Sequence, residues 1–204
     1  MSEISETKIE KNYENSNKNS KTKDSSFSSD KSNLSFEKTE ENEKRKINFP
    51  NIKNNKIIKS ISNLLIKLTE RPLKNIKRKS LKDIFTGKRL PNISMSDYLI
   101  RIITYSEIEE NTLISSLIYL DRFDQKKQIT KFNIHRILFC SILISIKYNE
   151  DEIYKNEFYS QIAGISLEEL NKIEYEFVSL LDFNLYIQPN MFNFYKELLV
   201  NNID

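Results

Sequence analysis

The sequence predicts an all-α fold, and two of its features support this prediction. Glycine occurs two times and proline four times in 204 residues, so the chain has few of the residues that hairpin turns and phosphate-binding loops require. From Ile57 onward, apolar residues recur at three- and four-residue steps, which is the period of an amphipathic helix. We therefore expect the folded part of the chain to be a bundle of helices.

The first 54 residues differ in composition from the rest of the chain. They consist mostly of lysine, asparagine, serine and glutamate, and they lack the apolar surface that would offset the entropy lost on ordering. We expect a disordered polar tail over residues 1–54 and one folded domain over residues 55–204. The serines of the tail are candidates for regulatory phosphorylation, and the alternative is a solvated extension with no regulatory role.

An amphipathic helix is expected to open the folded domain. One face carries five aliphatic residues, and the helix stops before Pro72; the five are Ile57, Ile61, Leu64, Leu65 and Leu68. Lysines on the other face would suit a helix at a membrane surface, but docking on the chain's own domain is the favoured interpretation. The basic loop over residues 71–89 is either a phosphate-binding or nuclear-import patch or a solvated linker.

Three longer helices are expected next, over residues 96–106, 110–124 and 132–147, because apolar residues recur there at helical spacing. The helix over residues 132–147 is apolar on nearly every side. Such a helix is normally surrounded by others, so we expect it to be the centre of the bundle.

Two helices with clear boundary signals follow. A short helix over residues 157–163 should end at Gly164, because glycine readily adopts the left-handed cap conformation. Ser166 and Glu169 have the spacing of a capping box, so the next helix should start there and run to about Phe183.

A last helix is expected after Pro189, with apolar positions at Phe192, Tyr195, Leu198 and Leu199. The folded domain then has one leading helix, five helices in the middle and one short helix at the end.

The inventory of reactive side chains argues against catalysis. His135 has no companion residue, and Cys140 lies in the middle of a helix, where a small hydrophobic residue fits. One cysteine excludes an internal disulfide, and together with one histidine it leaves no cluster for structural zinc. We therefore expect no catalytic residue, no metal and no cofactor.

Charge and hydropathy narrow the classes of partner. The net charge of +3 comes from 32 basic and 29 acidic residues, which does not indicate direct nucleic-acid binding. No apolar stretch has the length that a membrane span needs. We expect no contact with nucleic acid or membrane, and a location in the nucleus or the cytoplasm.

Three charged residues fall on or beside the apolar stripes: Asp121, Lys147 and Glu174. A charge buried alone is costly, so each needs a pair or a partner. Asp121 and Glu174 could act together as acid and base, but no pocket signature accompanies them. The favoured hypothesis for Asp121 is a buried ion pair with Arg101 of the preceding helix. Lys147 suits the negative end of its helix dipole, whereas Glu174 has no local explanation.

Several motifs in succession resemble the cyclin box. The string YLDRF (119–123) is followed by ITKFNIHRILFCSILISIKYNED (129–151), by YSQIAGISLEELNKIEYEFVSLLDFNLYIQP (159–189) and by MFNFY (191–195). Upstream, FTGKRLPNISMSDYLIRI (85–102) has the spacing seen before the first box helix. The resemblance covers residues 57–200 and is to the single-box class known as P- or U-type, which is related to the phosphate-signalling cyclins of yeast.

The resemblance implies a five-helix bundle with a central, hydrophobic third helix. It also implies that the chain is a regulatory subunit, not an enzyme, and that it forms a heterodimer with a cyclin-dependent protein kinase. In the family, the third and fifth box helices contact the kinase and hold its helix αC in the active position. Lys147 and Glu174 match the residues that hydrogen-bond to the kinase, and Asp121 matches the aspartate of a supporting charge network. ATP and magnesium belong to the kinase.

The chain departs from cell-cycle cyclins in one motif, and two other functions remain open. Where those cyclins carry the substrate-docking sequence MRAIL, this chain has PNISM (91–95), which puts such docking in doubt. The basic loop near Lys77 leaves open a cyclin-fold transcription or nucleic-acid-associated factor. The other alternative is a scaffold that keeps the cyclin fold but activates no kinase.

Overall fold

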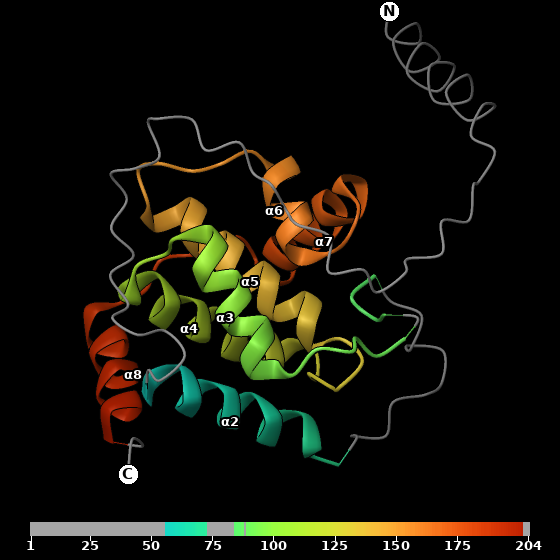
Figure 1. Cartoon of the computed structure of the whole chain (residues 1–204). Coiled ribbons are helices and arrows are strands. Elements are labelled where there is room, and N and C mark those ends of the chain that lie inside the picture. Colours follow the sequence, from blue (N-terminus) through green and yellow to red (C-terminus); the bar gives the residue numbers. More distant parts are fainter. Residues whose placement is uncertain (1–55, 73–83, 88, 202–204) are drawn as a thin grey trace, which may run out of the picture. The chain divides into compact units, whose positions relative to one another are not determined.

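The computed structural model describes residues 56–72, 84–87 and 89–201, and all regular elements in this part of the chain are helices (Figure 1). They are α2 (Lys56–Glu70), α3 (Met95–Ser106), α4 (Glu110–Lys126), α5 (Ile134–Asn149), α6 (Asn156–Ala163), α7 (Leu167–Leu180) and α8 (Pro189–Asn201). The predicted all-α fold, with a leading helix, five middle helices and a final helix, is confirmed. The predicted tail and most of the basic loop lie outside the described residues.

Helix α5 lies in the middle of the bundle, as its composition predicts (Figure 1). Every residue from Ile137 to Ile146 is buried, and α5 packs against α3, α4, α6 and α7. Burial of one large aliphatic side chain stabilises a fold by about 1.5–3 kcal/mol. The apolar sequence of α5 therefore explains why the other helices gather around it.

Small polar residues allow α4 and α5 to pack closely. The hydroxyl of Ser145 on α5 donates to the carbonyl of Thr112 on α4 at 2.6 Å. The buried hydroxyls of Ser116 and Ser141 donate to carbonyls in their own helices, at 2.6 Å and 2.8 Å. Each of these hydroxyls has a partner, so its burial carries little of the penalty of an unpaired polar group.

Aromatic rings tie the segment before α3 to the core. Phe85 and Phe123 are fully buried and meet edge to face at 5.1 Å between ring centroids, and Phe123 stacks on Phe177 at 5.1 Å. The amide of Gly87 donates to the carbonyl of Phe132 at 3.0 Å. A Cβ atom at Gly87 would lie 2.6 Å from Nη1 of Arg136, so glycine allows the chain to pass close to the start of α5.

The predicted boundaries of the short helix and its successor are confirmed at their shared corner. Gly164 ends α6 with φ of 72°, and Ser166 Oγ accepts a hydrogen bond from the amide of Glu169 at 3.1 Å. The other half of the capping box does not form, because the carboxylate of Glu169 pairs with Arg136 on α5 instead.

Helix α7 ends at Leu180, earlier than the predicted end near Phe183. Asp182 and Phe183 adopt left-handed conformations with φ of 53° and 55°. The amide of Phe183 reaches back to the carbonyl of Val178 at 3.0 Å. This bond satisfies a helix-terminal carbonyl in the manner of a Schellman cap. Such caps usually contain a glycine, and this one does not, so the sequence gives no signal for it.

Helix α2 docks on its own domain, as the favoured interpretation holds. Its buried residues Ile58, Ile61 and Leu65 join the common core, and the helix packs against α3 and α8. Just after it, Nη2 of Arg71 lies 2.8 Å from both carboxylate oxygens of Asp124 on α4. The leading helix is therefore fixed by apolar burial and by an ion pair.

Hydrogen bonds from the YLDRF motif hold the loop between α7 and α8; we call this set of bonds the clamp. The hydroxyl of Tyr119 donates to the carbonyl of Leu185 at 2.7 Å. The guanidinium of Arg122 donates to the carbonyls of Asn184 and Tyr186, at 2.7 Å and 2.9 Å. Burial, the largest cause, and the nearby Tyr148 raise the pKa of Tyr119 to about 12, so its hydroxyl remains a donor at neutral pH.

Arg122→Ala is expected to lower the free energy of unfolding by about 1.5–3 kcal/mol, because two carbonyls lose hydrogen bonds from a charged donor. Denaturant unfolding followed by circular dichroism measures this change. Lys172→Ala is the matched control, since its ion pair with Glu168 is exposed and contributes little. An Arg122→Ala variant as stable as the control would show that the clamp is energetically unimportant.

His135 makes the stability of the fold depend on pH. Its ring lies 5.0 Å from that of Tyr98, and its buried Nε2 has no hydrogen-bond partner among the described residues. Burial, the largest cause, lowers the pKa of His135, and Arg136 lowers it further, whereas the backbone of Ile93 opposes the shift. The unfolded chain therefore takes up a proton more readily than the folded chain does.

We expect the free energy of unfolding to be highest above the ordinary imidazole pKa of about 6.5 and to decrease as the pH falls through the lowered pKa. The chain has one histidine, so His135→Gln should remove this dependence. Urea unfolding between pH 7.5 and 5 compares the two proteins. Identical pH profiles would contradict the assignment to His135.

Candidate functional site

Lys147 and Glu174 form an ion pair at the surface between α5 and α7. Lys147 lies in the last turn of α5 and Glu174 in the middle of α7. Lys147 Nζ lies 2.5 Å from Oε1 of Glu174, and the two side chains are 27% and 17% exposed. The fold thus brings together two charges that the sequence singles out separately.

Asn156, at the start of α6, holds the other oxygen of the same carboxylate. Its Nδ2 donates to Oε2 of Glu174 and to Oδ1 of Asn171, both at 2.7 Å. Glu174 is therefore oriented from α5 and from α6 at once. The sequence offers no signal for this residue, because asparagine is abundant throughout the chain.

The pair lies at the edge of the core. Burial raises the pKa of the Cys140 thiol well above its ordinary value; Glu174 raises it further, whereas Lys147 and Arg136 oppose the shift. This thiol stays protonated, so it cannot serve as a nucleophile. On the outer side, Tyr175 follows Glu174 and is 68% exposed.

This arrangement suits binding better than catalysis. A lysine ammonium has three donors, and Lys147 uses one of them, toward Glu174, within the described part of the chain. The remaining donors and the exposed ring of Tyr175 can meet a second protein. We call the surface formed by Lys147, Asn156, Glu174 and Tyr175 the pair surface.

The predicted buried pair between Arg101 and Asp121 is not formed. Arg101 Nη2 donates to the carbonyl of Gln161 on α6 at 2.9 Å. Asp121 is exposed and accepts from Nε2 of Gln125 at 3.0 Å. The prediction is wrong because α3 packs mainly on α2, α5 and α6, whereas Asp121 faces α8.

Tyr195 on α8 is the residue that meets Asp121. Burial is the largest cause that raises the pKa of Tyr195 to about 12, and the charge of Asp121 and its hydrogen bond with the Tyr195 side chain add to the shift. The aspartate of the YLDRF motif therefore helps to hold α8 on α4.

In residues 56–72, 84–87 and 89–201, no three histidine, cysteine, aspartate or glutamate side chains gather in a way that could hold a metal ion. Within the same ranges, no helix combines the length and the apolar character that crossing a membrane requires.

Comparisons with known proteins agree with this architecture. The cyclin family model matches residues 3–185. Cyclin-U4-3 of Arabidopsis thaliana is 37% identical over 142 residues, which are 68% of this chain and 64% of the relative. Cyclin-P3-1 of Oryza sativa subsp. japonica is 34% identical over 135 residues, with coverages of 63% and 57%.

A fungal relative has a similar level of identity. The PHO85 cyclin-like protein psl1 of Schizosaccharomyces pombe is 38% identical over 122 residues, which are 58% of this chain and 50% of the relative. The chain thus spans about half to two thirds of the length of these three relatives. With a family match over most of the sequence and an all-helical bundle around α5, the chain belongs to the cyclin family and is similar to its P- and U-type members.

Proposed function

We propose that this cyclin is the activating regulatory subunit of a cyclin-dependent serine/threonine protein kinase. The observation that carries the proposal is the ion pair between Lys147 and Glu174, at the two positions that match the kinase-contacting residues of the family. The partial exposure of both side chains leaves the pair accessible to a second protein.

The chemistry of the pair surface favours an interface with another protein. Charge-assisted hydrogen bonds strengthen when a partner excludes water from them. Tyr175 supplies exposed aromatic area beside the charges, and aromatic residues are enriched among those that contribute most to binding. A helix of the kinase could therefore receive hydrogen bonds and apolar contact from the same few residues.

Activation would work through a shift of population. A protein kinase is active when the glutamate of its helix αC pairs with the lysine that holds the ATP phosphates. A cyclin that binds this arrangement more tightly than the inactive one increases its population by the ratio of the two affinities. The cyclin supplies no catalytic group, and ATP and magnesium are bound by the kinase.

In the scaffold alternative, the chain binds a kinase through the same surface but does not change the activity of the kinase. A scaffold would bind the kinase equally well in its active and inactive forms and would leave its activity unchanged. Measuring phosphorylation of a substrate peptide by the kinase, with and without the cyclin, separates these two hypotheses.

Lys147→Ala and Glu174→Ala should each weaken kinase binding by about 2 kcal/mol or more, or roughly 30-fold, because each removes a hydrogen bond from a desolvated contact. The free energy of unfolding of the free cyclin should fall by about 1 kcal/mol or less, since the pair is partly exposed. Titration calorimetry with the purified kinase and urea unfolding provide the two numbers. Glu168→Ala, which removes an exposed ion pair on the same helix, should leave the affinity unchanged.

Exchanging the two charges tests whether the pair acts in binding or only in folding. The double variant Lys147→Glu with Glu174→Lys keeps an ion pair within the cyclin but presents both charges at the wrong positions. We expect it to fold and to lose at least as much kinase affinity as the single alanine variants, because misplaced charges repel as well as fail to bond. Recovery of normal affinity in the double variant would make the pair structural.

The isolated cyclin should transfer no phosphate, since its sequence lacks the glycine-rich loop and catalytic aspartate motif of a kinase. Incubation with radiolabelled ATP and a general kinase substrate tests this expectation. Phosphotransfer that persists in a preparation free of other proteins would contradict the regulatory role.

A further inference from the structure

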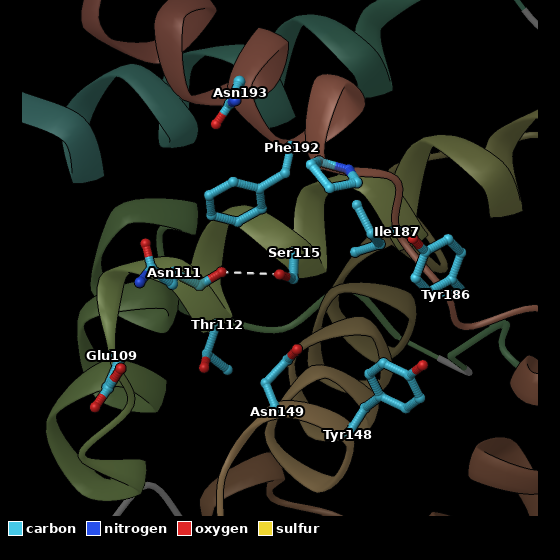
Figure 2. A pocket seen from close by; sticks show the side chains of 11 residues that line it. Glu109, Asn111, Thr112, Ser115, Tyr148, Asn149, Tyr186, Ile187, Phe192 and Asn193 are labelled. Atoms are coloured by element: carbon cyan, nitrogen blue, oxygen red, sulfur yellow. Dashed lines mark hydrogen bonds between the residues drawn. The ribbon is translucent and has the colours of Figure 1, made fainter.

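A second surface, lined by residues other than those of the pair surface, lies in a groove between α4 and α8. It has a volume of about 570 Å³ and is lined by the start of α4, the end of α5, the loop before α8 and the first turns of α8. We call it the α4–α8 groove (Figure 2). Its size falls within the range of about 300–1,000 Å³ typical of ligand-binding clefts.

Aromatic rings form one side and the floor of this groove. Tyr148 and Tyr186 are 50% and 62% exposed. Figure 2 shows these two rings on one side, Glu109 and Asn111 on the other, and Phe192 between them. Phe192 packs against the core and gives the groove an apolar surface, whereas the two tyrosine side chains are largely exposed.

The charge of the groove comes from one carboxylate. Glu109 is the only charged residue among those described that line it, and its carboxylate makes no ion pair within the described residues. Glu150 Oε1 accepts from the amide of Glu109 at 3.3 Å, so a second carboxylate lies close to Glu109. Lys147, which precedes Tyr148, is already paired with Glu174.

Three asparagine side chains also line the groove. Nδ2 of Asn149 is held by the carbonyl and the hydroxyl of Ser145, at 2.8 Å and 3.1 Å, which leaves its Oδ1 as an acceptor. The side chains of Asn111 and Asn193 also line the groove and are exposed. A primary amide offers both donors and an acceptor, which are the groups that an extended peptide backbone needs.

We propose that the α4–α8 groove binds an extended, arginine-containing segment of a partner protein. A guanidinium stacks on tyrosine rings and forms a bidentate bond with a carboxylate, and Tyr148, Tyr186 and Glu109 supply both chemistries in one groove. The asparagines would bond the peptide backbone, and an apolar neighbour of the arginine would contact Phe192. Nucleic acid and acidic peptides do not fit, because their charge has the same sign as Glu109.

This inference goes beyond the proposed kinase contact, because it uses none of the residues of the pair surface. A cyclin with both surfaces could hold a kinase through α5 and α7 and a second protein through the groove. Binding at the two surfaces can therefore be measured separately.

The test uses the full chain and oriented libraries of heptapeptides whose central residue is arginine, lysine, citrulline or glutamate. We expect the arginine library to be retained, and the best arginine peptide to bind at least tenfold more tightly than its citrulline counterpart in fluorescence anisotropy. Glu109→Gln and Tyr186→Ala should each weaken binding at least fivefold. Both side chains are exposed, and circular dichroism checks that the variants fold.

The matched controls come from α7. Tyr175→Ala removes a tyrosine that is as exposed as Tyr186, and Glu168→Gln neutralises an exposed glutamate; neither residue lines the groove, so peptide affinity should not change. Lys147→Ala should lose kinase binding and keep peptide binding. Glu109→Gln and Tyr186→Ala should weaken peptide binding and keep kinase binding. Failure of one proposal is therefore distinguishable from failure of the other.

Several results would overturn the assignment. Equal affinity for arginine and citrulline peptides, or preference for the glutamate library, would refute the charge argument. Affinity that is unchanged in Glu109→Gln and Tyr186→Ala, or lost equally in Tyr175→Ala, would place the peptide elsewhere. Peptide binding that is seen only after removal of residues 1–54 would show that the chain's own tail occupies the groove in place of a partner.

Discussion

The burial of α5 is the constraint on which the rest of the structure depends. Because every residue from Ile137 to Ile146 is enclosed by neighbouring helices, only the two ends of α5 can carry charge. Arg136 at one end pairs with Glu169, and Lys147 at the other pairs with Glu174, so both ion pairs join α5 to α7. The sequence of α5 thus determines where the pair surface can lie, namely where the apolar helix first reaches solvent beside α7.

The neighbouring acid and base of the YLDRF motif have separate tasks. Arg122 holds the loop after α7 by its carbonyls, whereas Asp121 meets Tyr195 on the following helix. Together they set the course of the chain from α7 into α8. That course places Tyr186 and Phe192 in the same groove as Glu109, so one motif within the bundle also shapes the α4–α8 groove. The two charges in this apolar stretch thus organise the packing of neighbouring segments.

Helices with strong periodicity could be predicted from the sequence to within about two residues, which is true of α3 and of the α6 to α7 corner. Contacts between helices could not, because they depend on crossing geometry that periodicity does not contain. The predicted pairing of Arg101 with Asp121 assumes that successive helices face each other, whereas Arg101 contacts Gln161. The sequence singles out Lys147 and Glu174 separately, but their mutual ion pair and the support from Asn156 emerge only from the fold.

The most direct measurement is hydrogen–deuterium exchange of this cyclin, alone and bound to a cyclin-dependent kinase that co-purifies with it. Helical amides exchange slowly, and a bound partner slows further those that its contact shields or stabilises. We expect added protection in the last turn of α5 and around Glu174 in α7, with the start of α4 and the first turns of α8 exchanging as in the free protein. Unchanged exchange at the end of α5 and in α7, with protection over α2 or α8 instead, would contradict the assignment of the kinase contact to the pair surface.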